Sequence, residues 1–189
     1  MPSSESTGVD PNSIGGNASI ETKEALSDLP LFYGIYTTSI HKGPIFAEDL
    51  HKRLKVTEVS VNKKVEEPNK LEGRVVLEMR VEEDMLNGAG AIHGGCTAFL
   101  IDICSTLALT ALELETTQNM SRSVSQSLNI VYHSPANLGD DIRIVNLTLT
   151  AGARTQSVRT EIWNATHRRL VASGTHIKMQ PSAPPQAKL

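Results

Sequence analysis

The fold is decided by the stretch from Asn87 to Leu112, NGAGAIHGGCTAFLIDICSTLALTAL, in which a glycine-rich segment runs directly into a long apolar one. From Cys96 to Leu112 the only charged residue is Asp102. A helix on the surface of a globular protein shows a polar stripe along one side, and this segment lacks one. We therefore expect a helix over 96–112 that is covered on most sides. The segment is short for a membrane span and contains several Ser and Thr residues, so we reject a membrane helix.

The glycine-rich segment 87–95 predicts a site for a carbonyl oxygen at the start of this helix. The first N–H groups of a helix have no partner inside it, and the helix dipole adds partial positive charge there. Gly94 and Gly95 let a ligand approach the backbone closely. His93 and Asn87 could donate further hydrogen bonds. Such donors stabilise an oxygen that becomes negative during a reaction.

Asp102 is the candidate base. A lone carboxylate in an apolar helix is costly unless it finds partners. Ser105 and Thr106 lie three and four residues further on, so we expect a narrow polar strip on that side of the helix. A carboxylate combined with an oxyanion site, without a serine or cysteine nucleophile beside a histidine, is suited to hydrolysis of an already reactive acyl group.

The segments around the helix predict a sheet. Two strand-like runs precede the helix and four follow it: 54–65, 74–81, 123–132, 141–150, 155–163 and 170–179. Short links between neighbours favour antiparallel pairing. A change of parity after Ile144 suggests a β-bulge in the fourth run. We predict the α+β class, with a curved antiparallel sheet wrapped around one long central helix. A further short helix is expected between Ser27 and Ile40.

The chain of 189 residues predicts one main domain, 31–180, between two flexible tails. Residues 1–30 carry five acids against one lysine, and residues 181–189 contain three prolines. The N-terminal residues show neither the apolar core of a secretory signal nor the arginines of a mitochondrial presequence. We therefore expect a cytoplasmic protein, with mitochondria as the less favoured alternative.

Charge and cysteine content exclude other classes. A net charge of −3 argues against a dedicated nucleic-acid binder. Cys96 and Cys104 are eight residues apart in one helix, or about 12 Å, which is too far for a disulfide. We expect two free thiols. No histidine stands at metal-ligand spacing from them, so we predict no metal site.

Three segments in the right order resemble the hotdog-fold acyl-CoA thioesterases, most closely the thioesterase superfamily member 2 type within the phenylacetate-thioesterase-like group. They are 87–103 (NGAGAIHGGCTAFLIDI), 124–139 (VSQSLNIVYHSPANLG) and 172–178 (ASGTHIK). The resemblance covers about residues 52–179. It implies the hotdog fold and hydrolysis of acyl-CoA to a carboxylic acid and coenzyme A in fatty acid metabolism. It also implies no cofactor beyond the coenzyme A of the substrate, and a homotetramer built as a dimer of dimers, with sites between subunits.

The same resemblance assigns roles to single residues. The Gly94 N–H and Asn87 would bind the thioester carbonyl, supported by His93. Asp102 from the partner subunit would act as a base or orient water, beside Ser125. A coenzyme A groove would run near 132–137 and the turn at 150–155. The substrate-binding residues implied are Gly95, Tyr132, His133, Ser134, Pro135, Asn137, Arg154, Thr155, His176 and Lys178, with Arg154 as a phosphate contact.

Two other functions stay open on the sequence. A non-catalytic acyl-CoA-binding module of the same fold would have no need of a buried base. A hotdog dehydratase for hydroxyacyl thioesters would use a histidine and an acid beside the substrate carbonyl, whereas His93 lies at the oxyanion end rather than opposite Asp102. The sequence sets neither the acyl-chain length nor an aryl preference.

Overall fold

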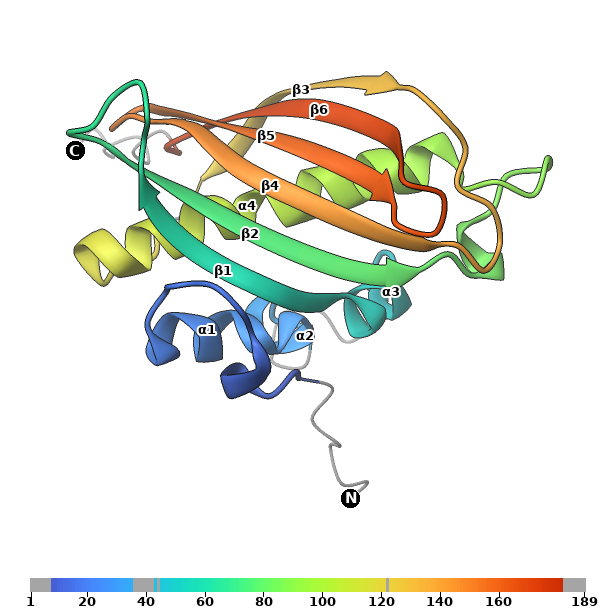
Figure 1. Cartoon of the computed structure of the whole chain (residues 1–189), viewed down its shortest axis with the longest axis horizontal. Helices are drawn as coiled ribbons and strands as arrows, with labels where there is room; N and C mark the ends of the chain where they lie inside the picture. The colour runs from blue at the N-terminus through green and yellow to red at the C-terminus, as the bar shows by residue number, and fades with distance from the viewer. Residues whose placement is uncertain (1–7, 36–42, 44, 122, 182–189) are drawn as a thin grey trace, which may run out of the picture.

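A six-stranded antiparallel sheet curves around one long helix, as Figure 1 shows for the computed structural model. The structure describes residues 8–35, 43, 45–121 and 123–181. The strand order is β1-β2-β4-β5-β6-β3. The strands are β1 (Lys55–Lys63), β2 (Leu71–Arg80), β3 (Val124–Tyr132), β4 (Asp141–Ala151), β5 (Thr155–Asn164) and β6 (Arg169–Met179). This arrangement confirms the predicted α+β class with a sheet wrapped around a central helix.

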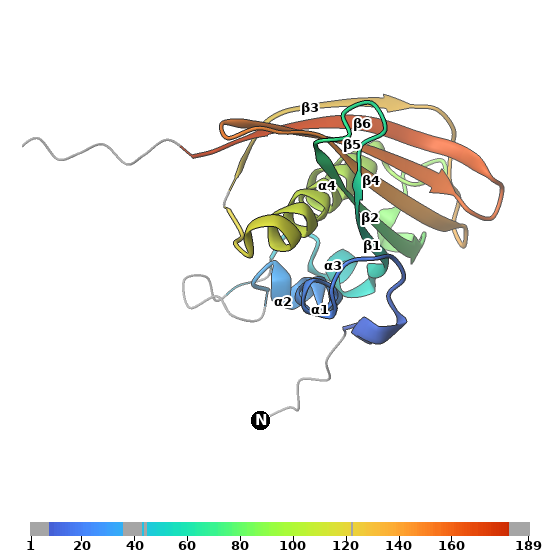
Figure 2. The same ribbon diagram turned by 60° about the vertical axis from the view of Figure 1, so that its left-hand side comes forward.

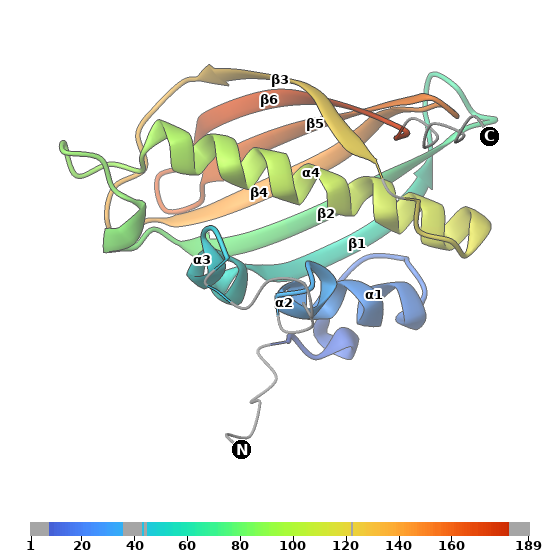
Figure 3. The same ribbon diagram turned by 180° about the vertical axis from the view of Figure 1, so that it is seen from behind.

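The central helix is α4 (Gly94–Thr117), which lies along the concave face of the sheet (Figure 3). It extends beyond the predicted 96–112 at both ends. His93 caps its start, and Gln118, in the left-handed conformation with φ 56°, ends it. By length and composition α4 would pass for a membrane span, but it is the core helix here, and 61% of its apolar window is buried inside the structure.

Close packing of α4 on the sheet requires glycine at position 73. A Cβ placed on Gly73 of β2 would lie 2.2 Å from the backbone oxygen of Ala108. The strand therefore approaches the helix backbone directly, and any side chain at this position would push the two elements apart.

The inward face of β4 keeps one parity along the strand: Ile142, Ile144, Asn146 and Thr148. The β-bulge predicted in this strand is therefore present, but not after Ile144. Asn146 faces inward although it is polar, because its Oδ1 accepts a hydrogen bond from Thr160 Oγ1 at 2.7 Å. The irregularity lies later, where the pairing with β5 shifts between Thr148 and Thr150.

The N-terminal residues differ from the expected flexible tail. Short helices α1 (Ile20–Ser27), α2 (Leu29–Phe32) and α3 (Glu48–Arg53) gather on one side of α4, beside β1 (Figure 2). A 3₁₀ turn, η1 (Pro11–Ser13), precedes them, and a second, η2 (Glu83–Met85), follows β2. Although apolar residues are few in this part of the sequence, Ile14, Leu26 and Leu29 are all buried in the core.

The N-terminal segment also covers one edge of the sheet. The Gly15 N–H donates to Thr57 O at 2.9 Å, and the Val59 N–H donates to Gly15 O at 3.0 Å. These bonds occupy backbone groups at the outer edge of β1. Residues 1–7 and 182–189 of the two predicted tails, and the end of the helix predicted to reach Ile40, lie outside the described residues.

Candidate active site

The first residue of α4 presents its backbone N–H at the end of the helix. His93 Nδ1 accepts a hydrogen bond from the Gly95 N–H at 2.9 Å, so the Gly95 donor is occupied. The His93 backbone N–H donates to Met85 O at 2.7 Å, which fixes the entry to the helix. Within the described residues the Gly94 N–H has no acceptor. Gly94 is therefore the donor available to a carbonyl oxygen, while His93 and Gly95 shape the end of the helix.

Asn87 holds the glycine-rich loop. Its Oδ1 accepts hydrogen bonds from the Ala89 N–H at 2.9 Å and the Ala91 N–H at 3.3 Å. Its backbone N–H donates to Ala91 O at 2.8 Å. Because the oxygen of the side-chain amide is used in the loop, the Nδ2 group is the part of Asn87 that can donate to a ligand.

The loop after β3 lies beside this helix end. The Ile92 N–H donates to Ala136 O at 2.8 Å, and Ala91 forms an isolated bridge with Asn137. The Tyr132 hydroxyl donates to Gly94 O at 3.0 Å. The structure thus brings most of the predicted 132–137 groove to the predicted carbonyl site.

Two residues of this loop are bound to β6. His133 Nε2 lies 2.9 Å from Ser173 Oγ, and Ser134 Oγ donates to Leu170 O at 2.5 Å. Pro135 is exposed on the same loop. His133 and Ser134 thereby hold the loop in place.

Asp102 lies near the middle of α4, and its side chain is 46% exposed. The Ser125 hydroxyl, from β3, donates to Asp102 Oδ1 at 3.2 Å. The structure therefore places Asp102 and Ser125 together, as the resemblance implied. The carboxylate is held from one side and open to solvent on another, which suits a group that must meet a water molecule.

His176 lies behind Asp102, which differs from the predicted place beside a coenzyme A groove. Its side chain is fully buried, with Nδ1 2.7 Å from Ser105 Oγ and Nε2 3.4 Å from Asp102 Oδ1. Nε2 is buried without a hydrogen bond in the described structure. Burial, reinforced by the nearby charge of Lys178, lowers the pKa of His176 below its ordinary value, so the neutral ring is favoured.

Lys178 is also buried rather than at a groove. It lies on β6 opposite Ser125 of β3, on the same inward face of the strand as His176. Burial lowers the pKa of Lys178, and the charge of Asp102 opposes that shift. The structure thus places His176 beside Asp102, with Lys178 close enough for the two charges to interact.

Arg154 and Thr155 lie at the other end of the sheet from Gly94. Thr155 pairs with Met179, whereas Tyr132, which contacts Gly94, pairs with Ala172. Ala172 and Met179 are seven residues apart on β6, which is about 23 Å along the strand. Within one chain, Arg154 and Thr155 therefore belong to the end of the sheet that carries Ser125.

Gly94 and Asp102 are also separated. They lie eight residues apart on one helix, which is about 12 Å along its axis. The attacking water must lie within about 3–3.5 Å of the carbonyl carbon. The donor to the carbonyl oxygen must lie equally close to that oxygen. A single chain therefore cannot supply both groups to one thioester.

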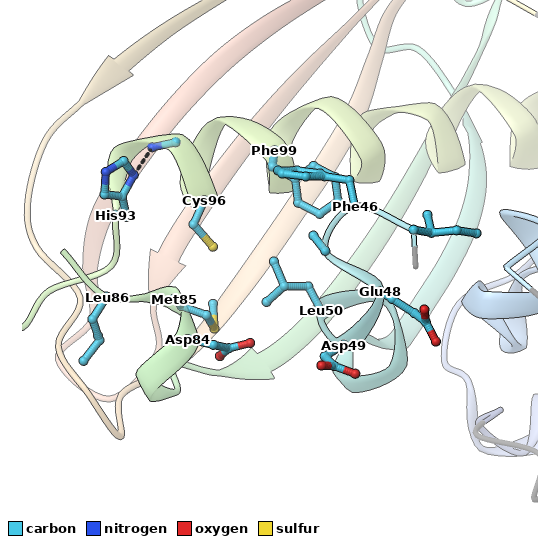
Figure 4. Close-up of a pocket in the computed structure, with 13 residues that line it drawn as sticks. Phe46, Glu48, Asp49, Leu50, Asp84, Met85, Leu86, His93, Cys96 and Phe99 are labelled. Atoms are coloured by element: carbon cyan, nitrogen blue, oxygen red, sulfur yellow. Dashed lines mark hydrogen bonds between the residues drawn. The ribbon is translucent and has the colours of Figure 1, made fainter. Parts of the chain in front are cut away.

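A cavity adjoins the N-terminus of α4 (Figure 4). It has a volume of about 710 Å³ and is lined by Phe46, Leu50, Met85, Cys96 and Phe99, with His93 and Gly95 at one end. Sequence reasoning missed these apolar residues because they come from separate segments and none stands out alone. Cys96 and Cys104 are free thiols, as predicted. No three metal-ligating side chains gather in the described part of the chain.

The sheet, the central helix and its open N-terminal donor define a thioester hydrolase with the hotdog fold. The family model of the thioesterase superfamily matches residues 89–171. The chain is 40% identical to acyl-coenzyme A thioesterase 13 of Homo sapiens over 106 residues, which are 56% of this chain and 72% of the human protein. The chain belongs to the thioesterase superfamily.

Solved structures agree. The crystal structure of zebra fish thioesterase superfamily member 2 matches with a TM-score of 0.60 and 28% identity, over 74% of this chain and 89% of that one. Thioesterase superfamily member 2 from Mus musculus matches with a TM-score of 0.51 and 35% identity, over 57% of this chain and 81% of that one.

Proposed function

We propose that this thioesterase hydrolyses acyl-CoA to a free carboxylic acid and coenzyme A. The observation that carries the proposal is the half-exposed Asp102 carboxylate, hydrogen-bonded by Ser125, on the same helix as the available Gly94 N–H. The relatives at 37–40% identity are named as acyl-coenzyme A thioesterases, which supports the same substrate class.

In the proposed reaction, Asp102 and Ser125 hold a water molecule. Asp102 takes one proton as the water oxygen attacks the thioester carbon. The carbonyl oxygen becomes negative and is stabilised by the Gly94 N–H and Asn87 Nδ2. The intermediate then expels the coenzyme A thiolate, which receives the proton from Asp102. Such a base contributes typically about 10²–10⁴-fold to the rate. Every group comes from the chain or the substrate, so the proposal needs no separate cofactor.

The proposal requires a second subunit, because Gly94 and Asp102 of one chain are about 12 Å apart. The two edges of the sheet differ in a way that favours pairing through β3. The segment around Gly15 covers the β1 edge, whereas β3 pairs only with β6 in the described chain. Exposed apolar residues lie along β3: Val124, Leu128, Val131 and Tyr132.

An exposed strand edge with apolar side chains is a surface that another strand can cover. In a two-fold pair joined at β3, the two subunits run in opposite directions. The Asp102 end of one subunit would then lie beside the Gly94 end of the other, and the pair would have two such sites. Arg154, at the Asp102 end, would then lie near the coenzyme A of the partner's site. Association of two such pairs into a tetramer is part of the proposal, and light scattering measures it.

A polar cluster lies behind Asp102. Ser105 Oγ donates its one proton to Asp102 O at 2.9 Å, so it accepts from His176 Nδ1 at 2.7 Å. His176 Nε2, 3.4 Å from Asp102 Oδ1, makes no hydrogen bond in the described structure. His176 therefore supports the turn of α4 that carries Asp102 through Ser105, and does not orient the carboxylate directly.

Two substitutions of Gly94, one that removes its N–H and one that keeps it, test the carbonyl site. Gly94 is the first residue of α4, where proline is well tolerated, and its N–H has no acceptor in the described structure. Gly94→Pro removes this donor and should lower kcat about 10²–10³-fold. Gly94→Ala keeps the N–H, and its Cβ would meet Tyr132 at an ordinary 3.5 Å, so it is the matched control.

Thiol release from several acyl-CoAs is the assay, with Asp102→Asn as the second variant. The proposal is supported if the wild type and Gly94→Ala release thiol, while Gly94→Pro and Asp102→Asn lose this activity. Full activity in purified Asp102→Asn would overturn the assignment of the base. Binding of acyl-CoA without thiol release by the wild type, or formation of an enoyl product, would overturn the proposed reaction.

A further inference from the structure

The cavity beside the N-terminus of α4 is formed by three parts of the chain (Figure 4). Phe46 and Leu50 come from the α3 region, Met85 from η2, and Cys96 and Phe99 from α4. Its volume of about 710 Å³ is within the range of sites that hold small organic ligands. His93 and Gly95, which border the Gly94 N–H, line one end of it.

The aromatic wall of this cavity, Phe46 and Phe99, packs against further rings outside the cavity. Phe99 makes edge contacts with Phe46, at a centroid distance of 5.2 Å, and with the buried His51, at 5.5 Å. His51 in turn contacts the Tyr33 ring at 4.9 Å. The Tyr33 hydroxyl donates to Ile103 O at 2.8 Å. The wall is therefore preformed, which reduces the entropy lost when a ligand binds.

Phe46 is the exposed member of this wall, with 77% of its surface accessible. In Figure 4 its ring lies against Phe99, facing the cavity rather than the core of the domain. A large apolar side chain left this open gains from an apolar ligand that covers it. Substitution of Phe46 should also cost little folding stability, since it buries little in the chain itself.

The charged groups of the cavity are acidic. No lysine or arginine is among its described lining residues. Three carboxylates line it: Glu48, Asp49 and Asp84. Nearby cations are already engaged. Lys52 Nζ lies 2.7 Å from Glu48 Oε1, and Arg53 Nη2 lies 2.7 Å from Asp84 Oδ1. A further anion placed here would lie among three carboxylates, with no lysine or arginine of the described lining to pair with it, which is costly for a desolvated charge.

We propose that this cavity binds the acyl group of the substrate, selects an uncharged apolar chain of medium length, and rejects an acyl group that ends in a carboxylate. The proposal rests on the proposed acyl-CoA hydrolysis. The carbonyl lies at Gly94, the chain enters past Gly95 toward Cys96 and Phe99, and the sulfur leaves on the opposite side, toward Tyr132. A two-carbon acyl group would not reach Phe46.

The test compares acetyl-, hexanoyl- and octanoyl-CoA with the carboxylated suberoyl-CoA, which has the same eight-carbon chain as octanoyl-CoA. From acetyl to octanoyl, kcat/KM should rise about fourfold per methylene (about 0.8 kcal/mol) until the cavity is full. Suberoyl-CoA should react at least about 100-fold more slowly than octanoyl-CoA, because its carboxylate is unpaired.

Phe46→Lys should narrow the preference for octanoyl-CoA over suberoyl-CoA about 50-fold, as the product of two opposite effects. It should lower kcat/KM for octanoyl-CoA about tenfold, because an apolar contact is lost. It should raise kcat/KM for suberoyl-CoA about fivefold, because the carboxylate gains a partially exposed cation. Val65→Lys, at an equally exposed apolar residue in the β1–β2 turn, is the matched control and should alter none of the four substrates.

A second readout is independent of turnover. Cys96 lines the cavity and Cys104 is buried, so a maleimide reagent reports on Cys96. Burial raises the pKa of the Cys96 thiol to about 11, so labelling is slow and is followed over hours. In Asp102→Asn, octanoyl-CoA should slow this labelling and acetyl-CoA should not.

The outcomes separate the two proposals. If the wild type hydrolyses no acyl-CoA, the proposed function fails, and protection of Cys96 by octanoyl-CoA still decides whether the cavity holds an acyl chain. If the wild type hydrolyses all four substrates equally and Phe46→Lys changes nothing, the cavity is not the acyl site, although the enzyme remains an acyl-CoA thioesterase. Lack of Cys96 protection together with a normal octanoyl KM would also overturn the inference.

Discussion

Ser125→Ala tests how Asp102 is held for catalysis. The substitution removes a hydroxyl that donates to Asp102 Oδ1 at 3.2 Å and that has no other partner among the described residues. A hydrogen bond to a charged group contributes about 1.5–3 kcal/mol. Because Asp102 is 46% exposed, solvent screening puts the value near or below the lower end of that range. At about 1–1.5 kcal/mol, kcat should fall about five- to tenfold.

The control is a neighbouring serine. Ser127 lies two residues further along β3, is exposed, and makes no side-chain hydrogen bond in the described structure. Ser127→Ala should therefore leave kcat unchanged. Both variants are measured by thiol release in a single turnover, which isolates the chemical step from product release.

A double-mutant cycle with Asp102→Asn completes the experiment. If Ser125 acts through Asp102, removing both groups should cost little more than removing Asp102 alone. The reasoning is refuted if Ser125→Ala keeps wild-type kcat, or if its effect adds fully to that of Asp102→Asn.

Two stability predictions follow from the core. Gly73→Ala should destabilise the fold by about 3 kcal/mol, because its Cβ would overlap Ala108 O at 2.2 Å. Gly88→Ala is the control, since its Cβ would meet no atom within 4 Å. Urea unfolding compares the two variants, and equal unfolding midpoints would contradict the packing. Burial lowers the pKa of both His51 and His176, so the unfolded state binds protons more readily. Stability should then fall as pH drops below about 6.5, by at most about 1.4 kcal/mol per pH unit for each histidine; His176→Gln should reduce this dependence, and an unchanged slope would contradict the burial.

The central helix and the strands could be predicted because their patterns are local. An apolar run with a single charge identifies α4, and alternation identifies most strands. The inward face of β6 was harder to predict, because His176 and Lys178 occupy positions that alternation assigns to apolar residues. His176 lies 3.4 Å from Asp102, and the charge of Asp102 favours the cationic form of Lys178. Both interactions join residues far apart in the sequence.

The N-terminal segment and the cavity show the same limit. Average composition made residues 1–30 resemble a tail, yet a few apolar residues, Ile14 and Leu26 among them, are enough to dock short helices on the core. Phe46 and Phe99 meet across 53 positions of the chain, and neither has a local signature. Sequence patterns locate elements, whereas the wall of the cavity depends on how those elements meet.

Subunit complementation tests the central claim, that Gly94 of one subunit and Asp102 of its partner form one site. Gly94→Pro and Asp102→Asn are each inactive in this account. Refolded together, half of the pairs are mixed, and each mixed pair has one intact site, so activity should return to about a quarter of the wild-type level. The Gly94→Pro/Asp102→Asn double variant mixed with wild type is the control, since its mixed pairs contain no intact site. Mixtures of the single variants that stay inactive, with mixed pairs confirmed by mass spectrometry, would contradict the claim.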